Sequence, residues 1–128
     1  MNSNKITTRT AEIWKDEHDI IHMLILNNVS LDLDDVIDNI LVLRNFTQDA
    51  PRLKFVDSRN SWTITIEAKK FSEKADSAKR TIARAILVSN KTDAVLKNFL
   101  MKFNQPDIPS KLFTESEKAM EWLLSFKK

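Results

Sequence analysis

The sequence predicts an α/β domain, classed as α+β in some schemes, in which about four helices cover a mixed sheet. Two apolar segments of strand length come first, joined by a polar turn, a pattern typical of a β-hairpin. After them, apolar strand-length segments alternate with segments whose apolar residues recur at helical spacing. Such alternation is typical of parallel strands joined by right-handed helical crossovers. A length of 128 residues suits one domain, which we place at residues 10–128, and we expect residues 1–9 to be disordered or extended.

Residues 11–15 and 20–26 form the predicted hairpin, with the polar turn at residues 16–19. The second strand is apolar on both faces, which is typical of a strand covered on both sides. We predict that His22 in this strand is half-buried and hydrogen-bonded rather than a metal ligand. The only other histidine, His18, falls in the turn, and a zinc site needs more ligands than these two can supply.

A helix is predicted from residue 33 to about residue 46. Its apolar positions follow a 3.6-residue period and are Leu33, Val36, Ile37, Ile40 and Leu41. Asp32 is the predicted N-cap, and Asp34 and Asp35 lie in the first turn, where the helix dipole favours acidic side chains. Capping therefore explains these aspartates better than binding of a divalent cation does.

A short strand is predicted at residues 53–57, where five consecutive residues are bounded by polar segments. Residues 58–63 are predicted to form a polar loop that is interrupted by Trp62. Thr65 is placed to cap the next helix, which we expect over about residues 66–79.

The C-terminal third is predicted to alternate strands with helices. Strands are expected at residues 84–88 and 111–113, with a helix over about residues 95–104 between them. The spacing Thr114-x-x-Glu117 matches a capping box and opens a last helix. The apolar face of that helix is formed by Ala119, Trp122, Leu123 and Phe126.

The composition excludes several kinds of chemistry, because glycine and cysteine are absent. Without glycine there is no Walker loop, dinucleotide fingerprint or G-x-S-x-G elbow. Without cysteine there is no disulfide, thiol nucleophile or zinc finger. No spacing suggests a catalytic triad or a carboxylate dyad, so we expect a protein that is not an enzyme and that uses no cofactor and no metal.

The distribution of apolar residues bears on location. The longest apolar stretch, residues 20–26, is far shorter than the roughly 20 residues that cross a membrane. The polar N-terminal residues lack the apolar core of a signal peptide. We therefore expect no membrane span and a cytoplasmic location.

Charge is distributed unevenly along the chain. Residues 1–64 contain 7 Lys and Arg against 10 Asp and Glu, and residues 65–128 contain 13 against 8. A basic cluster in the second half consists of Lys69, Lys70, Lys74, Lys79, Arg80 and Arg84. Phe71 is the only aromatic residue within this cluster. A surface that binds single-stranded nucleic acid interleaves cations with several aromatic side chains. We expect a solvated basic face and no nucleic-acid partner.

Several local strings match the pattern of one known family. They are AEIW (11–14), LDLDD (31–35), VD (56–57), AILV (85–88), NFL (98–100), FNQP (103–106), KLFTE (111–115) and EWL (121–123). Together with the order of elements, these strings resemble STAS-like bacterial domains, which are SpoIIAA-like and similar to anti-sigma-factor antagonists, within an uncharacterised branch. The resemblance covers about residues 10–126 and implies a STAS-like fold.

The resemblance also implies a non-enzymatic regulatory module that binds another protein, in bacterial signalling. In members that act as sigma-factor switches, an Asp-Ser stretch followed by Gly opens the helix after the third strand, and a partner kinase phosphorylates the serine. Here Thr65 and Ile66 fall at this place, so the acceptor pattern is not reproduced. Trp62 is either an exposed anchor for the partner or a lid over the core. The implied partner surface is formed by Asp57, Ser58, Ser61, Trp62, Thr63 and Thr65.

Two other functions stay open at this stage. The first alternative is a small-ligand or lipid-binding domain with an apolar groove between helices and sheet, and the candidate walls are Phe71, Phe99, Leu100 and Phe103. The second is an enzyme, which would need a cleft with His22 or a carboxylate of perturbed pKa at its base. A homodimer would cover Trp122 and the edge strands of an open sheet, and the sequence leaves this state undecided.

Overall fold

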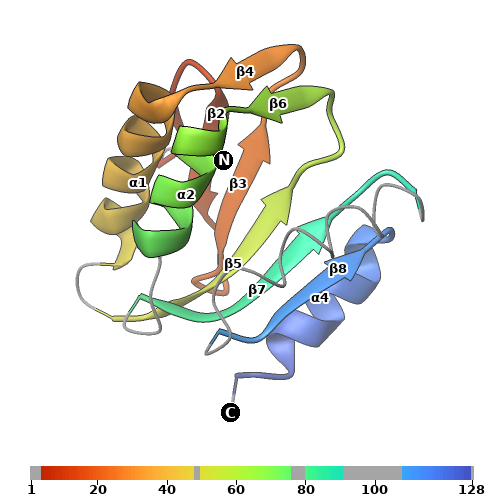
Figure 1. Ribbon diagram of the computed structural model, residues 1–128. Coiled ribbons are helices and arrows are strands. Elements are labelled where there is room, and N and C mark those ends of the chain that lie inside the picture. Colours follow the sequence, from red (N-terminus) through yellow and green to blue (C-terminus); the bar gives the residue numbers. More distant parts are fainter. Residues whose placement is uncertain (1–3, 48–49, 76–79, 91–107, 128) are drawn as a thin grey trace.

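The main sheet has six strands in the order β1-β2-β3-β5-β7-β8 (Figure 1). The computed structural model describes residues 4–47, 50–75, 80–90 and 108–127. The strands are β1 (Ile6–Thr7), β2 (Ala11–Lys15), β3 (Ile21–Ile25), β5 (Arg52–Asp57), β7 (Thr81–Leu87) and β8 (Ser110–Phe113). Neighbours from β1 to β3 pair antiparallel, and neighbours from β3 to β8 pair parallel. The predicted α/β class, mixed sheet and N-terminal hairpin are therefore confirmed.

Asp16 holds the turn between β2 and β3. Its Oδ1 accepts hydrogen bonds from the backbone N–H groups of His18 and Ile20, at 2.8 and 3.0 Å. Asp19 adopts a φ of 63°, a left-handed conformation that Asp tolerates better than most residues do. Local hydrogen bonding thus closes this hairpin without glycine.

A second, two-stranded sheet was not expected from the sequence. It pairs β4 (Val29–Leu31) with β6 (Trp62–Ile64) in parallel. The prediction of an irregular loop through residue 63 was therefore wrong for its last two residues. The alternate residues of both strands pack into one hydrophobic cluster beneath the small sheet, which explains why such short strands form.

The helices lie on both faces of the main sheet. Helices α1 (Leu33–Thr47) and α2 (Ile66–Ala75) cover one face, and α4 (Ser116–Leu124) covers the other (Figure 1). The described part of the chain therefore holds three of the roughly four helices expected. The helix expected at residues 95–104 lies outside the described residues, as does the end of the second helix beyond residue 75. No helix in the described ranges is both long and apolar enough to cross a membrane.

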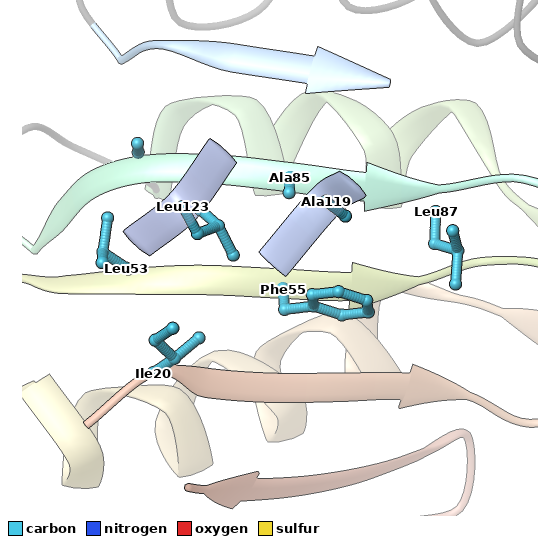
Figure 2. Close-up of a cluster of buried hydrophobic side chains, with 8 residues drawn as sticks. Ile20, Leu53, Phe55, Ala85, Leu87, Ala119 and Leu123 are labelled. Atoms are coloured by element: carbon cyan, nitrogen blue, oxygen red, sulfur yellow. The ribbon is translucent and has the colours of Figure 1, made fainter. Parts of the chain in front are cut away.

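The contact between α4 and the sheet forms one of the hydrophobic clusters (Figure 2). Ala119 and Leu123 of α4 are fully buried against β5 and β7, where Phe55 and Ala85 point toward the helix. Small side chains at a helix–sheet contact allow the helix to approach closely. The contact of Ala119 and Leu123 with these strands is thus part of a packed core.

The starts of the three described helices test the N-caps predicted from the sequence. Asp32 caps α1 as predicted, because its Oδ1 accepts a hydrogen bond from the N–H of Asp35 at 3.0 Å. Thr65 caps α2 as predicted, because its Oγ1 accepts one from the N–H of Ala68 at 3.1 Å. The capping box predicted at Thr114 was wrong, since the N-cap of α4 is Glu115 and makes no side-chain cap bond.

The apolar face of α1 is rotated slightly from the predicted one. Val36 is buried and Ile40 packs against the same cluster, as expected. Leu41 is instead 55% exposed, so its prediction as a core position was wrong. Leu43 takes its place and packs against the cluster formed with β2 and β3. The inward face in the second half of α1 is therefore formed by Val42, Leu43 and Phe46 and not by Leu41.

The N-terminal residues are joined to α1 by polar side chains. Asn39 is 2% exposed, and it donates a hydrogen bond to Thr10 Oγ1 at 3.0 Å and accepts one from Thr8 Oγ1 at 2.6 Å. Arg9 binds both carboxylate oxygens of Asp35 and the carbonyl oxygen of Ser30. These bonds place residues 8–10 against the helix, which the sequence did not indicate.

Candidate functional site

A cavity of about 220 Å³ lies between the main sheet and helices α1 and α2, and it is partly open to solvent. Its floor is formed by strands β3, β5 and β7, and the small sheet of β4 and β6 closes one end. We call it the α1–α2 cavity. Its apolar lining residues are Met23, Ile25, Leu31, Val36, Ile40, Leu43, Val56, Trp62 and Ile64, and its polar ones are Asn39, Arg44, Thr47, Lys54, Ser72, Arg80 and Arg84.

Helix α1 forms one wall of the cavity through residues spaced three and four apart. Val36, Ile40 and Leu43 supply the apolar part of this wall. Arg44 continues the same face in the last turn, where a cation interacts favourably with the helix dipole.

Successive side chains of the floor strands point to opposite faces of the sheet, so alternate residues of β5 and β7 line the cavity. In β5, Leu53 and Phe55 point to α4, whereas Lys54 and Val56 point into the cavity. In β7, Arg84 lies opposite Lys54 in the parallel register and also lines the cavity. Polar and charged side chains thus enter a space where a core would otherwise be packed.

Trp62 closes the cavity next to the small sheet. It is half-buried, and its Nε1 donates a hydrogen bond to the carbonyl oxygen of Ser58 at 3.1 Å. Its ring packs with the cluster of Ile25, Leu31 and Val36. Of the two roles left open by the sequence, the structure gives Trp62 the role of a lid.

The other residues of the predicted partner surface serve several structural purposes. Asp57 forms an ion pair with Arg59, with Oδ2 2.8 Å from Nη2. Ser58 is 2% exposed, and its Oγ donates a hydrogen bond to the carbonyl oxygen of Leu87. The N–H of Ser61 donates to the side chain of Asn27, whereas its own side chain is exposed.

The accessible part of that surface lies at the start of α2. Thr63 and Thr65 are exposed, and Ile66 beside them is 75% exposed. Ile66 is the most exposed of the large hydrophobic side chains in the described residues.

Of the four predicted groove walls, only Phe71 falls within the described residues. Phe71 is 39% exposed and does not line the α1–α2 cavity. Phe99, Leu100 and Phe103 lie outside the described residues.

The sequence assigned Arg80 and Arg84 to a solvated basic face, but both are half-buried and line the cavity. Arg44 was not singled out, because taken alone it resembles a surface cation. The alternation of Lys54 with apolar neighbours in β5 was the one available signal.

A row of stacked rings lies on the opposite face of the sheet. The rings of Trp14 and His22 stack with centroids 5.0 Å apart, and those of His22 and Phe55 stack at 5.1 Å. His22 Nε2 lies 2.7 Å from Asp16 Oδ2, so the prediction of a half-buried, hydrogen-bonded histidine is confirmed. A second cavity, of about 250 Å³, lies between this row and α4.

Two aspartates have altered acidity. Burial raises the pKa of Asp16, but hydrogen bonds from the His22 ring and from the N–H groups of Ile20 and His18 outweigh it, so the pKa is lowered. The hydrogen bond from Arg9, supported by the N–H of Asp32, lowers the pKa of Asp35 to about 2. Both carboxylates therefore stay charged at neutral pH and act in fixed structural contacts. Within the described residues, no three histidine or acidic side chains gather in a group that could hold a metal ion.

The chain is similar in structure to an uncharacterised protein of the DUF3478 family with a SpoIIAA-like fold, from Shewanella loihica PV-4. The TM-score is 0.66 at 14% sequence identity, and the match covers 92% of this chain and 98% of that one. The expected SpoIIAA-like fold is therefore confirmed.

Residues 13–127 match the family described as Domain of unknown function (DUF7793), and the chain belongs to this family. No curated protein matches the chain.

Proposed function

We propose that this protein is a non-enzymatic, cytoplasmic binding module that holds a small apolar ligand in the α1–α2 cavity. One observation carries the proposal, which is the size and lining of the cavity. The cavity of about 220 Å³ is partly open to solvent, so a ligand can reach it, and most of its lining surface is apolar, as in typical small-molecule sites. An apolar cavity of about 150 Å³ is already large enough to bind benzene.

Binding of a neutral probe to a filled cavity tests this function. Replacing Ile40, which lines the cavity, with Phe puts a larger ring into the space that a ligand would occupy. Isothermal titration calorimetry with n-octanol is expected to show binding to the unaltered protein and at least a tenfold weaker affinity for Ile40→Phe.

The matched control is the neighbouring residue on the same helix. Leu41 is 55% exposed and does not line the cavity, so Leu41→Phe is expected to bind n-octanol like the unaltered protein. Absence of octanol binding to the unaltered protein, or equal affinities for it and Ile40→Phe, would contradict ligand binding in this cavity.

A second candidate function is regulatory binding of another protein through the start of α2. The observation that favours it is the exposed side chain of Ile66, the first residue of α2, which follows the exposed Thr65. Apolar side chains at the centre of a surface are typical anchors of protein interfaces. The SpoIIAA-like fold supports this candidate because STAS-like domains of the sigma-factor switches meet their partners at the corresponding helix.

The contacts of Trp62 and Thr65 make these residues unsuitable for testing this surface. Trp62 and Thr65 hold the lid and the helix cap, so replacing them would alter the fold as well as the surface. Ile66→Asp removes the exposed anchor alone, and Leu41→Asp on α1 is the matched control. Proteins that copurify with the tagged chain from its source cells are expected to be lost with Ile66→Asp and kept with Leu41→Asp. Retention with both variants would contradict this surface.

A further inference from the structure

Cationic side chains gather at one end of the α1–α2 cavity. Arg44 lies in the last turn of α1, and Arg80 directly precedes β7. The N–H of Arg52 donates a hydrogen bond to the carbonyl oxygen of Arg80 at 3.2 Å, which joins the starts of β5 and β7. Figure 1 shows the end of α1 beside these two strand starts. Arg44 and Arg80 therefore lie at the same end of the cavity.

Two further cations lie on the floor at this end. Lys54 is the third residue of β5 and is 8% exposed, and Arg84 lies opposite it in the register of β5 and β7. None of the described residues that line the cavity carries a carboxylate.

The other end of the cavity is apolar. Leu31 and Ile64 of the small sheet, together with Trp62, line the space farthest from the starts of β5 and β7 (Figure 1). Val36 and Ile25 continue this lining toward the middle of the cavity. The site therefore has a cationic end and an apolar end, joined by one continuous space.

We propose that the ligand is an amphipathic anion, a hydrocarbon chain that ends in a carboxylate or phosphate group. This inference rests on the proposed function, because it assigns a ligand class to the same cavity. The anionic group contacts Arg44 and Arg80, whose guanidinium groups can each donate two parallel hydrogen bonds to such a group. The chain extends toward Trp62. By proportion to the cavity that holds benzene, about 220 Å³ takes a chain of about eight carbons.

The cationic lining at this end disfavours ligands whose headgroup is cationic or neutral. A cationic headgroup would meet Arg44 and Arg80 and would be repelled. A neutral alcohol of the same length gains the apolar contacts but not the ionic ones. The charge of the headgroup should therefore separate ligands that share one chain.

Calorimetric titration with three probes of equal chain length tests the headgroup. Octanoate or octyl phosphate is expected to bind at least tenfold more tightly than n-octanol, since hydrogen bonds between charged groups are stronger than neutral ones. Whichever anion binds more tightly identifies the headgroup as carboxylate or phosphate. Shortening octanoate to hexanoate is expected to weaken binding about fourfold per methylene lost.

Substitution of Arg44 and Arg80 tests whether these arginines cause the preference for an anionic headgroup. The double variant Arg44→Gln/Arg80→Gln is expected to lose at least tenfold in affinity for the anions and to keep its affinity for n-octanol. Arg44→Lys/Arg80→Lys is expected to restore part of the loss, because it keeps the charge but not the forked geometry. The matched control is Arg59→Gln, because Arg59 pairs with Asp57 and does not line the cavity.

The possible failures are distinguishable. If n-octanol binds as tightly as both anions, or if the double glutamine variant binds the anions unchanged, the assignment of an anionic ligand is overturned while ligand binding in the cavity stands. If none of the three probes binds, both are overturned. Unchanged circular dichroism and thermal unfolding midpoints for the variants show that the readout reports binding rather than folding.

Discussion

The two faces of the main sheet differ in what lines their cavities. The cavity between the sheet and helices α1 and α2 is lined by several cations and by no carboxylate of the described residues. The cavity on the α4 face lies beside the packed cluster of Ala119 and Leu123, and its lining includes the carboxylate of Asp57.

The same strands build both faces, since β5 presents Leu53 and Phe55 to α4 and presents Lys54 and Val56 to the α1–α2 cavity. Because successive side chains of a strand point to opposite faces, one face can carry the stability of the domain while the other carries a site. In this comparison, the cations Lys54 of β5 and Arg84 of β7 distinguish the face to which we assign ligand binding.

The largest expected effect tests the packed cluster on the α4 face. Leu123 of α4 is fully buried and belongs to the same hydrophobic cluster as Leu53 and Phe55, with Leu53 beside it (Figure 2). Leu123→Ala is expected to lower the free energy of unfolding by about 3 kcal/mol, because it removes buried methyl groups and leaves a void. Urea denaturation measures the change.

The matched control for this variant is Leu41→Ala on the other side of the molecule. Leu41 is 55% exposed, so its truncation is expected to change the free energy of unfolding by less than about 0.5 kcal/mol. Equal losses for the two variants would show that α4 does not carry the packed core.

A smaller effect is expected at the start of α1, beside the cavity. Asp35 accepts hydrogen bonds from Arg9 and from the N–H of Asp32, and its pKa is lowered to about 2 from an ordinary 3.8. Asp35→Asn is expected to cost about 2 kcal/mol at pH 7, the range of a hydrogen bond to a charged group.

The pH dependence of this contribution has a definite sign. Because the pKa of Asp35 is lower in the folded protein, the unfolded chain takes up the proton first as the pH falls. The stabilisation from Asp35 is therefore complete above about pH 4 and is lost as the pH falls toward 2. The difference between the unaltered protein and Asp35→Asn in urea denaturation should shrink over this window, and a difference that stays constant down to pH 2 would refute the assignment.

The smallest effect compares the starts of two helices on opposite faces. Thr65 caps α2 through its side chain, whereas Thr114, before α4, makes no cap. Thr65→Ala is expected to cost about 1 kcal/mol in unfolding free energy, and Thr114→Ala close to nothing. Thermal unfolding of the two variants decides the point, and a larger loss for Thr114→Ala would restore the capping box that the sequence suggested.

The elements that the sequence predicts well are those with strong local periodicity. The strands at residues 11–15 and 52–57 and the helix that begins at Leu33 all follow from the spacing of apolar residues, and the caps at Asp32 and Thr65 follow from side-chain chemistry. The strands β4 and β6 could not be predicted in this way, since each has three residues and each is stabilised by a partner more than thirty residues distant in the chain.

The candidate site was predictable only in part. An apolar space between helices and sheet was among the expectations, but its walls were assigned to the wrong segment where Phe71 is concerned. A cavity depends on how two helices rest on a sheet, which no local pattern encodes. Arg44, Arg80 and Arg84 come together only in the folded chain, so their common role is visible in the structure and not in the sequence.

The comparison between the two faces leads to one decisive measurement. Methyl-labelled isoleucines report on both faces, because Ile25, Ile40 and Ile64 line the cavity and Ile20 belongs to the core under α4. On titration with octanoate, the methyl resonances of Ile25, Ile40 and Ile64 are expected to shift in nuclear magnetic resonance spectra, and that of Ile20 to stay in place. Unmoved resonances at the three cavity positions, or an equal shift at Ile20, would contradict the assignment of ligand binding to the face covered by α1 and α2.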